Sequence, residues 1–497
     1  MTSSRRVSAN RPVTQIAPDF SAIRAAIANF ELSPRVEPNE PIAIDRAYLP
    51  EGHRGVLDLK RQLVVGNRGM GKSFWTHALL NDTLRTRLAE VYGHPQLKSA
   101  RVEIGFNGSI KINPIAPTTE EILGLYAKDH SPDLIWRGVL FRAAKIVLKE
   151  HSIPSLEESI SRIRRDPALF SRELSALDDQ LAAGGESLLL VFDALDRLGQ
   201  DWDSIRKLTR ALLALAVGLQ SFRAIRVKIF MRVDQFSDEE LFRFPDSSKI
   251  RNDAVYLSWR PNELYGLLLF EILRDTGGRP ALQALAEKIS AQRALPDNGR
   301  DNAVFIDDQA LLIEAIAGEF MGSNKKRGRV YTWVPLHLSD AANTCSPRSF
   351  FIAWRKAAEH HPVPAGRAID HLGLLDGVRS ASTARLTELY EDYPWIKPTL
   401  QALHRQFVPM ERQQLFDLWT EKAVMGTIAQ AAKTASVNAP VGFGEGAEAS
   451  TLLAAMTNVA VMEERGNGKI NVPDIFRVDA EILRKGGVAV PRRPVRA

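Results

Sequence analysis

The stretch GNRGMGKS at residues 66–73 is the feature that most constrains this chain. It fits the pattern G-x-x-x-x-G-K-[ST] at every position. The apolar run RQLVV (61–65) precedes it, and SFWTHALLNDTL continues it with a helical pattern. A strand, a glycine-rich turn and a helix in this order place successive backbone N–H groups and a helix N-terminus around a phosphate. The sequence therefore predicts a phosphate-binding P-loop.

All eight residues of the loop are candidate nucleotide contacts. The ammonium group of Lys72 is expected on the β- and γ-phosphates, and the hydroxyl of Ser73 is expected on Mg²⁺. Asn67 and Arg68 occupy the part of the loop where a γ-phosphate or a neighbouring subunit would be sensed. The predicted ligands are ATP and Mg²⁺, held by Gly66, Asn67, Arg68, Gly69, Met70, Gly71, Lys72 and Ser73.

Length and composition set the class of protein. A chain of 497 residues exceeds one ordinary core, and 45% hydrophobic with 25% charged residues is typical of a folded chain. The only cysteine, Cys345, allows no intramolecular disulfide and no thiolate zinc cluster, which fits a reducing cytosol. No signal peptide and no apolar run of about eighteen residues is found, so we expect a cytoplasmic protein without a membrane partner.

The hydrophobic pattern divides the chain into four parts. Residues 1–50 form a lead-in that we expect to dock on the core, and residues 51–262 alternate strand and helix patterns. Apolar helical stripes then indicate a lid over 263–365, followed by a C-terminal region over 366–497 with a basic tail. The predicted class is α/β, a P-loop NTPase core with a parallel sheet, with expected strands at 61–65, 101–106, 187–192, 226–231 and 254–259.

The end of the C-terminal region has the outline of a winged helix. A Gly/Ala-rich loop (436–450) precedes a helix, a strand, a turn at residues 466–468 and a returning strand. This outline serves contacts with proteins as often as contacts with DNA. The pattern therefore leaves both kinds of partner open.

A second acidic element accompanies the loop. The apolar run SLLLVF (187–192) ends in Asp193, and Asp196 follows three residues later. A carboxylate at the mouth of a strand beside a phosphate loop can hold the Mg²⁺ shell. Asp193 is therefore the expected metal ligand with Ser73, and Asp196 is a candidate for orienting or deprotonating a water. A helix cap after a strand is the alternative reading of Asp193.

The segment DALD at residues 193–196 resembles the corresponding segment of NACHT-type ATPases within the STAND class, a branch close to AAA+. That family usually has an acidic residue next, whereas this chain has Arg197. The difference puts activation of a water in question and leaves Mg²⁺ binding untouched.

The same resemblance implies roles for several basic residues. Arg232 ends the fourth predicted strand, where STAND proteins often have a sensor arginine, although a surface ion pair explains it equally well. Arg348 follows Pro347 at a helix start, similar to the sensor-2 helix of an AAA+ lid. Candidates for an arginine finger reaching a neighbouring subunit precede the last core strand: Arg243, Lys249 and Arg251.

Most of residues 50–488 also resembles bacterial P-loop ATPases of phage-defence and other conflict systems, through VVGNRGMGKSF, VFDALDRL, SPRSFFIAW and PDIFR. This resemblance implies an ATP-driven switch that forms a homo-oligomer and acts on a separately encoded effector. A DNA-binding loader or transposition helper is the alternative, supported by the winged-helix-like C-terminus and the net charge of +6. The cations beside Tyr331 and Trp333 in NKKRGRVYTW are a candidate nucleic-acid clamp, with a solvated loop beside a buried aromatic pair as the favoured alternative. A nucleotide-dependent scaffold that does not hydrolyse ATP is the third reading, prompted by Arg197.

Overall fold

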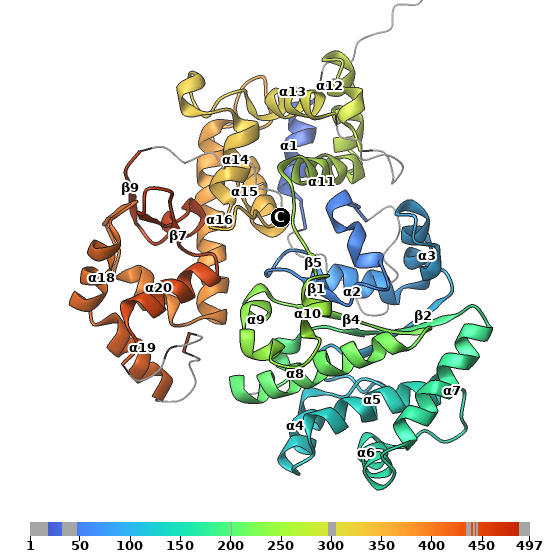
Figure 1. Cartoon of the computed structure of the whole chain (residues 1–497). Helices are drawn as coiled ribbons and strands as arrows, with labels where there is room; N and C mark the ends of the chain where they lie inside the picture. The colour runs from blue at the N-terminus through green and yellow to red at the C-terminus, as the bar shows by residue number, and fades with distance from the viewer. Residues whose placement is uncertain are drawn as a thin grey trace, which may run out of the picture.

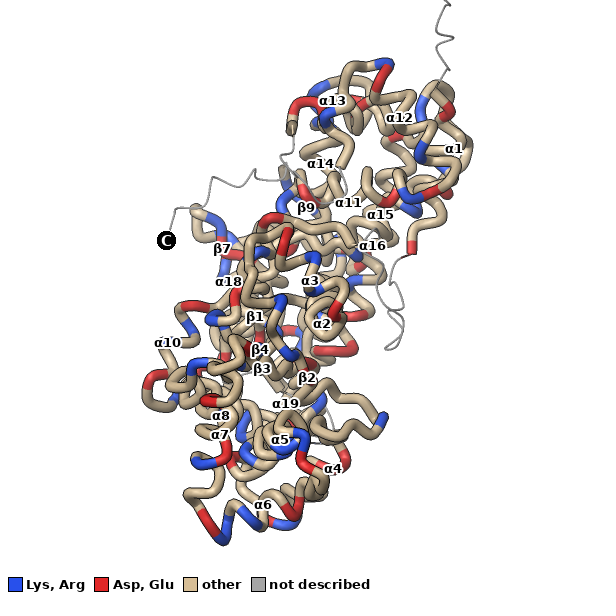
Figure 2. Tube along the Cα trace, turned by 90° about the vertical axis from the view of Figure 1, so that its right-hand side faces the viewer, with Lys and Arg blue, Asp and Glu red and all other residues tan. Residues whose placement is uncertain are grey.

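The computed structural model describes residues 18–31, 47–199, 201–296, 305–433, 439–440, 443 and 446–486. The basic tail beyond residue 486 and part of the loop at 436–450 lie outside these ranges. Figure 1 shows a sheet unit (residues 47–256) beside a helical unit (residues 18–31 and 261–486). In the view of Figure 2, the molecule is elongated, with α12 and α13 near one end and α6 at the other.

A five-stranded parallel sheet forms the centre of the sheet unit, in the order β2-β3-β4-β1-β5. The predicted strands are confirmed, although the last is much shorter than its apolar run. Because β4 lies between β1 and β3, the residue after β4 is placed between the P-loop and Asp193. The strands are β1 (Leu63–Val65), β2 (Ala100–Phe106), β3 (Ser187–Phe192), β4 (Ile225–Met231) and β5 (Val255–Tyr256).

Helices cover both faces of this sheet, which explains why its strands are apolar on both sides. Val64 and Phe230 point to the face covered by α2 (Lys72–Leu80) and α3 (Asp82–Val91). Leu63 and Ile229 point to the opposite face, covered by α5 (Pro132–Val147) and α8 (Trp202–Gly218). The remaining helices of the unit are α4 (Thr119–Ala127), α6 (Leu156–Arg165), α7 (Leu169–Ala183), α9 (Val233–Ser237) and α10 (Ser247–Arg251).

Among the buried titratable side chains of the sheet unit, His53 and Lys228 have pKa values that burial lowers. His53 accepts a hydrogen bond at Nδ1 from Trp75 Nε1 (2.9 Å) and donates from Nε2 to the carbonyl of Ser258 (3.0 Å). Burial lowers the pKa of His53 to about 4. The ammonium of Lys228, in β4, donates to the carbonyl of Asp58 (2.7 Å), and burial lowers the pKa of Lys228 to about 7.

The helical unit has one continuous apolar core that joins the predicted lid (263–365) and the C-terminal region. The long helix α16 packs closely on α15, where Gly373 and Gly377 face the backbone of α15. After α1, the first helices of the helical unit are α11 (Pro261–Arg274), α12 (Gly278–Lys288), α13 (Ile306–Ala317), α14 (Val330–Leu338), α15 (Pro347–Glu359) and α16 (His371–Asp392). Within the part of the chain that the structure describes, no helix is long and apolar enough to cross a membrane.

Helix α1 (Phe20–Ala28) docks on the helical unit, whereas the last residues of the predicted lead-in, Ala47 and Leu49, are buried in the sheet unit. It packs against α11, α12 and α15 of the helical unit. Ile23, Ile27 and Phe30 are buried in that unit's core, and the guanidinium of Arg24 donates to the carbonyls of Ala368 (2.9 Å) and His360. An amphipathic helix binds the largest apolar surface available to it, and here that surface is the lid.

The C-terminal part has the expected winged-helix outline. The helix α20 (Ala449–Asn458) leads into an antiparallel hairpin of β7 (Glu463–Glu464) and β8 (Ile470–Asn471). Met410 bridges to Ile470 and adds a third extended segment. The other elements are α17 (Ile396–Gln401), β6 (Phe407–Val408), α18 (Arg412–Glu421), α19 (Val424–Lys433), α21 (Asp474–Arg477) and β9 (Leu483–Arg484).

Candidate phosphate-binding site

The P-loop connects β1 to α2 and depends on its glycines. Gly69 (φ 81°) and Gly71 (φ 105°) are in left-handed conformations that other residues rarely adopt. Gly71 caps the N-terminus of α2. A Cβ on Gly66 would lie 3.1 Å from Cβ of Leu257, so this glycine permits close packing on the segment after β5. The backbone therefore curls at the carboxyl edge of the sheet, as the motif predicts.

Lys72 folds back over the loop that precedes it. Its Nζ donates to the carbonyls of Gly66 (2.8 Å) and Asn67 (3.1 Å). Burial lowers the pKa of Lys72, the charge of Arg232 acts in the same direction, and Asp193 opposes both. The ammonium group therefore lies at the loop, held by bonds to carbonyls that a phosphate can replace. Ser73 is exposed at the first turn of α2.

Asp193 follows β3 and is 8% exposed. Its carboxylate accepts hydrogen bonds from Thr76 Oγ1 (3.0 Å) and from the N–H of Ala194 (2.8 Å). Burial raises the pKa of Asp193, although the Ala194 bond and the charge of Lys72 act against the shift. Sequence analysis did not single out Thr76. Its spacing of four residues from Lys72 was the available signal, because it places both on one side of α2.

Asp196 and Arg197 lie on a 3₁₀ turn (Leu195–Arg197) after the left-handed residue Ala194 (φ 56°). The side chain of Asp196 is 43% exposed and lies 3.9 Å from Arg232. Arg197 is exposed, and its side chain lies beside Gly108 in the loop after β2. The turn therefore directs Asp196 toward Arg232 and Arg197 toward the loop after β2.

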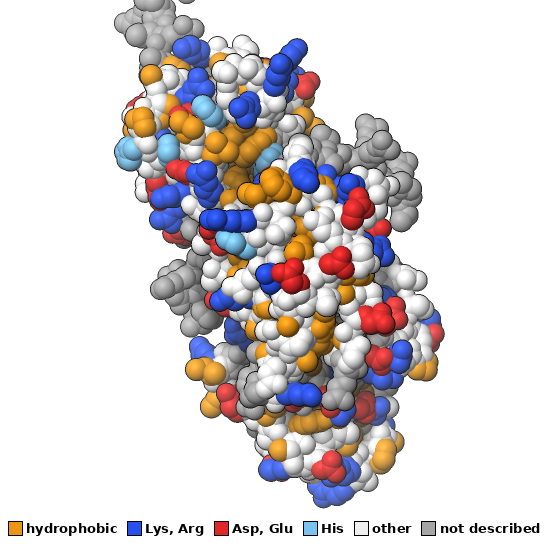
Figure 3. All heavy atoms as spheres, turned by 90° about the vertical axis from the view of Figure 1, so that its left-hand side faces the viewer, with side chains coloured by type: hydrophobic (Ala, Val, Ile, Leu, Met, Phe, Trp, Pro, Cys, Tyr) orange, Lys and Arg blue, Asp and Glu red, His pale blue; other side chains and the backbone are white. Residues whose placement is uncertain are grey.

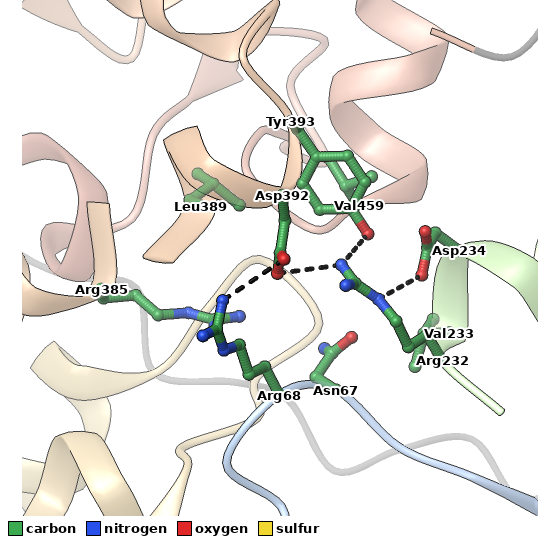
Figure 4. A pocket seen from close by; sticks show the side chains of 10 residues that line it. All are labelled: Asn67, Arg68, Arg232, Val233, Asp234, Arg385, Leu389, Asp392, Tyr393 and Val459. Carbon is green, nitrogen blue, oxygen red and sulfur yellow. Dashed lines mark hydrogen bonds and ion pairs between the residues drawn. The ribbon is translucent and has the colours of Figure 1, made fainter. Parts of the chain in front are cut away.

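Arg232 follows β4 and is the most connected cation of the site. Its guanidinium donates to Asp234 (3.2 Å) and to the hydroxyl of Tyr393 (2.6 Å), and it pairs with Asp392 at 3.0 Å. Figure 4 shows these groups converging on one cleft. The side chain of Arg232 is only 16% exposed. Burial and multiple partners exclude the reading of Arg232 as a surface ion pair.

The helical unit closes the other side of the loop. A Cβ on Gly69 would lie 3.3 Å from Cβ of Arg348, and Arg348 pairs with Glu388 of α16 at 2.6 Å. Arg68 pairs with Asp392 (3.3 Å) and Glu391 (3.4 Å) of the same helix. The Cβ of Arg348 therefore lies beside the P-loop while its guanidinium is paired with Glu388, and a sensor-2 role for Arg348 stays a prediction. Sequence analysis missed the acidic residues of α16.

The three finger candidates lie between η6 (Glu239–Phe242) and β5, each in local contacts. Arg243 pairs with Glu240 (2.6 Å), and Lys249 pairs with Asp246 (3.0 Å). Arg251 stacks on the ring of Phe242 at 5.0 Å. A role for any of them in a neighbouring subunit stays a prediction.

The candidate nucleic-acid features are less favourable. Tyr331 stacks on Tyr265 (ring centroids 4.5 Å apart) and Trp333 stacks on His337 (3.7 Å), so intramolecular stacking already occupies both rings. The winged-helix helix α20, with the sequence ASTLLAAMTN, carries no Lys or Arg. Figure 2 shows basic and acidic residues interspersed along the described trace, and Figure 3 shows side chains of both signs on the face in view.

The residues present fit a magnesium nucleotide but not a metal held by protein alone. Among the described ranges, no group of three or more His, Cys, Asp or Glu side chains is arranged to hold a metal ion. Mg²⁺ usually takes one or two protein ligands together with phosphate oxygens and water. The buried carboxylate of Asp193, next to the loop and to Lys72, meets that requirement.

Comparisons with known proteins find only distant structures. No family model and no curated protein matches the chain. A Walker-type ATPase of Pyrococcus abyssi aligns over 90% of this chain and 99% of its own, with 11% identity and a TM-score of 0.40. The Cdc6p protein of Pyrobaculum aerophilum aligns over 90% and 95%, with 15% identity and a TM-score of 0.29. The ORC2 protein of Aeropyrum pernix aligns over 92% and 98%, with 14% identity and a TM-score of 0.29. The P-loop NTPase fold of the core is evident from this chain's own loop and parallel sheet.

Proposed function

We propose that this protein is an ATP-binding switch in which the helical unit responds to the nucleotide bound at the sheet unit. One observation carries the proposal: the half-buried Lys72 and the buried Asp193 lie at the carboxyl edge of the parallel sheet, beside a P-loop that Arg348 of the helical unit contacts. Lys72 would contact the β- and γ-phosphates, and Ser73 and Asp193 would hold Mg²⁺. Mg²⁺ neutralises phosphate charge when it is bound. Arg232 and Arg348 would then contact phosphate oxygens as charge-assisted donors.

Hydrolysis by this site is expected to be slow. A water-activating group must lie within hydrogen-bond reach of the water it orients. Asp196 is half exposed on a turn beside Arg232, and the next position is occupied by Arg197, which points elsewhere. A single-turnover measurement with excess protein distinguishes a slow ATPase from a scaffold that binds ATP without cleaving it. Product formed at the rate of the uncatalysed reaction would favour the scaffold.

The binding site is tested by Lys72→Ala. A hydrogen bond to a charged group contributes about 1.5–3 kcal/mol, so the variant should bind Mg·ATP at least about tenfold more weakly. Lys326→Ala is the matched control, because Lys326 is exposed on a loop of the helical unit. Calorimetric titration with unchanged ATP affinity in Lys72→Ala would refute the site.

The setting in a bacterial defence or signalling system, a homo-oligomer and a separately encoded effector are proposed from the sequence resemblance alone. The DNA-loader alternative predicts salt-dependent DNA binding that changes with ATP. The absence of cations from α20 weighs against its use as a recognition helix. Binding of duplex DNA at low salt, measured with and without ATP, decides between the two.

A further inference from the structure

The last turn of α16 places acidic side chains against arginines of the nucleotide site. Asp392 lies between two of them, 3.3 Å from Arg68 of the P-loop and 3.0 Å from Arg232 after β4. Glu391 adds a second contact to Arg68. Figure 4 shows the Asp392 carboxylate between both guanidinium groups. Two of the arginines that line the cleft, Arg68 and Arg232, are therefore already paired with the same anion, whereas Arg385 pairs with Glu388 (3.4 Å).

The position of these acids on their helix is unfavourable in itself. The C-terminus of a helix carries partial negative charge and favours basic residues. The last turn of α16 has no basic residue, and it ends in Glu391 and Asp392. The arginines across the cleft compensate for this charge. The unfavourable position of Glu391 and Asp392 on their helix is therefore offset by their contacts with Arg68 and Arg232.

The bridging geometry matches that of a phosphate. A guanidinium group binds the oxygens of carboxylates and phosphates through the same planar set of donors. The side chains of Asp392 (17% exposed) and Arg232 (16%) are largely shielded from water. The cleft that holds the Asp392 carboxylate is also lined by Asn67 and Arg68, so this carboxylate lies beside the predicted phosphate-binding loop.

The contact joins two bodies with separate cores. Asp392 ends a helix buried in the core of the helical unit, whereas Arg68 and Arg232 belong to the sheet unit. Loss of this contact would free the end of α16 from the P-loop. Tyr393, which follows Asp392 and binds Arg232, would move with it.

We propose that the Asp392 carboxylate occupies the place of the γ-phosphate in the nucleotide-free protein, and that a nucleoside triphosphate displaces it. The inference rests on the proposed nucleotide site. In this proposal the helical unit responds to nucleotide because the γ-phosphate replaces the Asp392 carboxylate on Arg68 and Arg232. A diphosphate lacks the competing group and leaves the contact in place.

The experiment compares ATP and ADP affinities in wild type and Asp392→Asn by calorimetric titration with Mg²⁺. Removing the competing charge should tighten ATP binding by about tenfold, the effect of one charged hydrogen bond, and leave ADP affinity within about twofold. Asp392→Glu keeps the charge and should retain the wild-type ratio. Asp417→Asn, an exposed change of the same kind on α18, is the control.

A second measurement needs no variant. In wild type, amide hydrogen exchange at residues 386–393 should accelerate with ATP but not with ADP. Equal exchange with both nucleotides, or an unchanged ATP-to-ADP affinity ratio in Asp392→Asn, overturns the exchange of anions. Failure of wild type to bind either nucleotide, or identical binding by Lys72→Ala, overturns the proposed function instead.

Discussion

Gly377 lies where α16 crosses α15, and its replacement by alanine tests how closely the two helices must approach. A Cβ at this position would lie 2.1 Å from the carbonyl oxygen of Ala353 and 2.8 Å from its carbonyl carbon. Both are backbone atoms of a buried helix, so no flexible side chain can move aside. The two helices would have to separate.

The magnitude follows from two opposing effects. Alanine in place of glycine favours a helix by about 1 kcal/mol. Overpacking of a close contact costs about 1–3 kcal/mol. A separation of 2.1 Å lies at the severe end of overpacking, so Gly377→Ala should lower the free energy of unfolding by about 1–2 kcal/mol. Gly124, inside α4, is the control, because a Cβ there meets nothing within 4 Å. Gly124→Ala should raise stability by about 1 kcal/mol.

Urea denaturation followed by tryptophan fluorescence measures both changes, and Trp354 on α15 is a buried reporter beside the crossing. Native-state hydrogen exchange should show faster opening of α15 and α16 in Gly377→Ala. The argument from close packing is wrong if Gly377→Ala unfolds at the same or a higher urea concentration than wild type while Gly124→Ala behaves as expected.

Two predictions concern pH. The pKa of His53 is about 4 when folded and about 6.5 when unfolded, so the unfolded chain binds the extra proton between these values. Stability should therefore fall by roughly 3 kcal/mol as pH drops from 6.5 to 4, and His53→Gln should remove this part of the pH dependence. The pKa of Lys228 is about 7 when folded and 10.5 in its ordinary state. The free energy of unfolding should therefore rise between pH 7 and pH 9 by about 1.4 kcal/mol per pH unit, because the unfolded chain binds the extra proton in this range. Lys228→Met should remove this part of the pH dependence. A wild-type free energy of unfolding that falls between pH 7 and pH 9 contradicts the lowered pKa of Lys228.

Local patterns in the sequence predict the centre of the molecule well. The P-loop, the parallel strands and the acid after β3 each follow from a few neighbouring residues, because glycine turns and apolar periodicity act over short distances. Asp193 and the P-loop meet because parallel strands bring their carboxyl ends to one edge. The same reasoning reaches Arg232, since β4 lies between the other two strands.

The partners of these residues could not be predicted in the same way. Arg68 meets Asp392 across a separation of 324 residues, and Arg232 meets Tyr393 across 161. From the sequence alone, Glu391 and Asp392 cannot be told apart from acidic residues at a solvent-exposed helix end. Pairings of this kind depend on how two cores are oriented, and no short pattern records that orientation. The docking of α1 on the helical unit could not be predicted for the same reason.

The docking of α1 also has a consequence for the order of folding. Arg24 binds the carbonyl of Ala368 across 344 residues of chain, so this contact closes a very large loop. During synthesis the helix emerges long before its docking surface exists. Ile23, Ile27 and Phe30 must stay exposed until the lid has been translated and folded. The first helix that the structure describes is therefore among the last to be packed, and a nascent chain arrested before the lid presents an unpaired apolar surface to chaperones and to other chains.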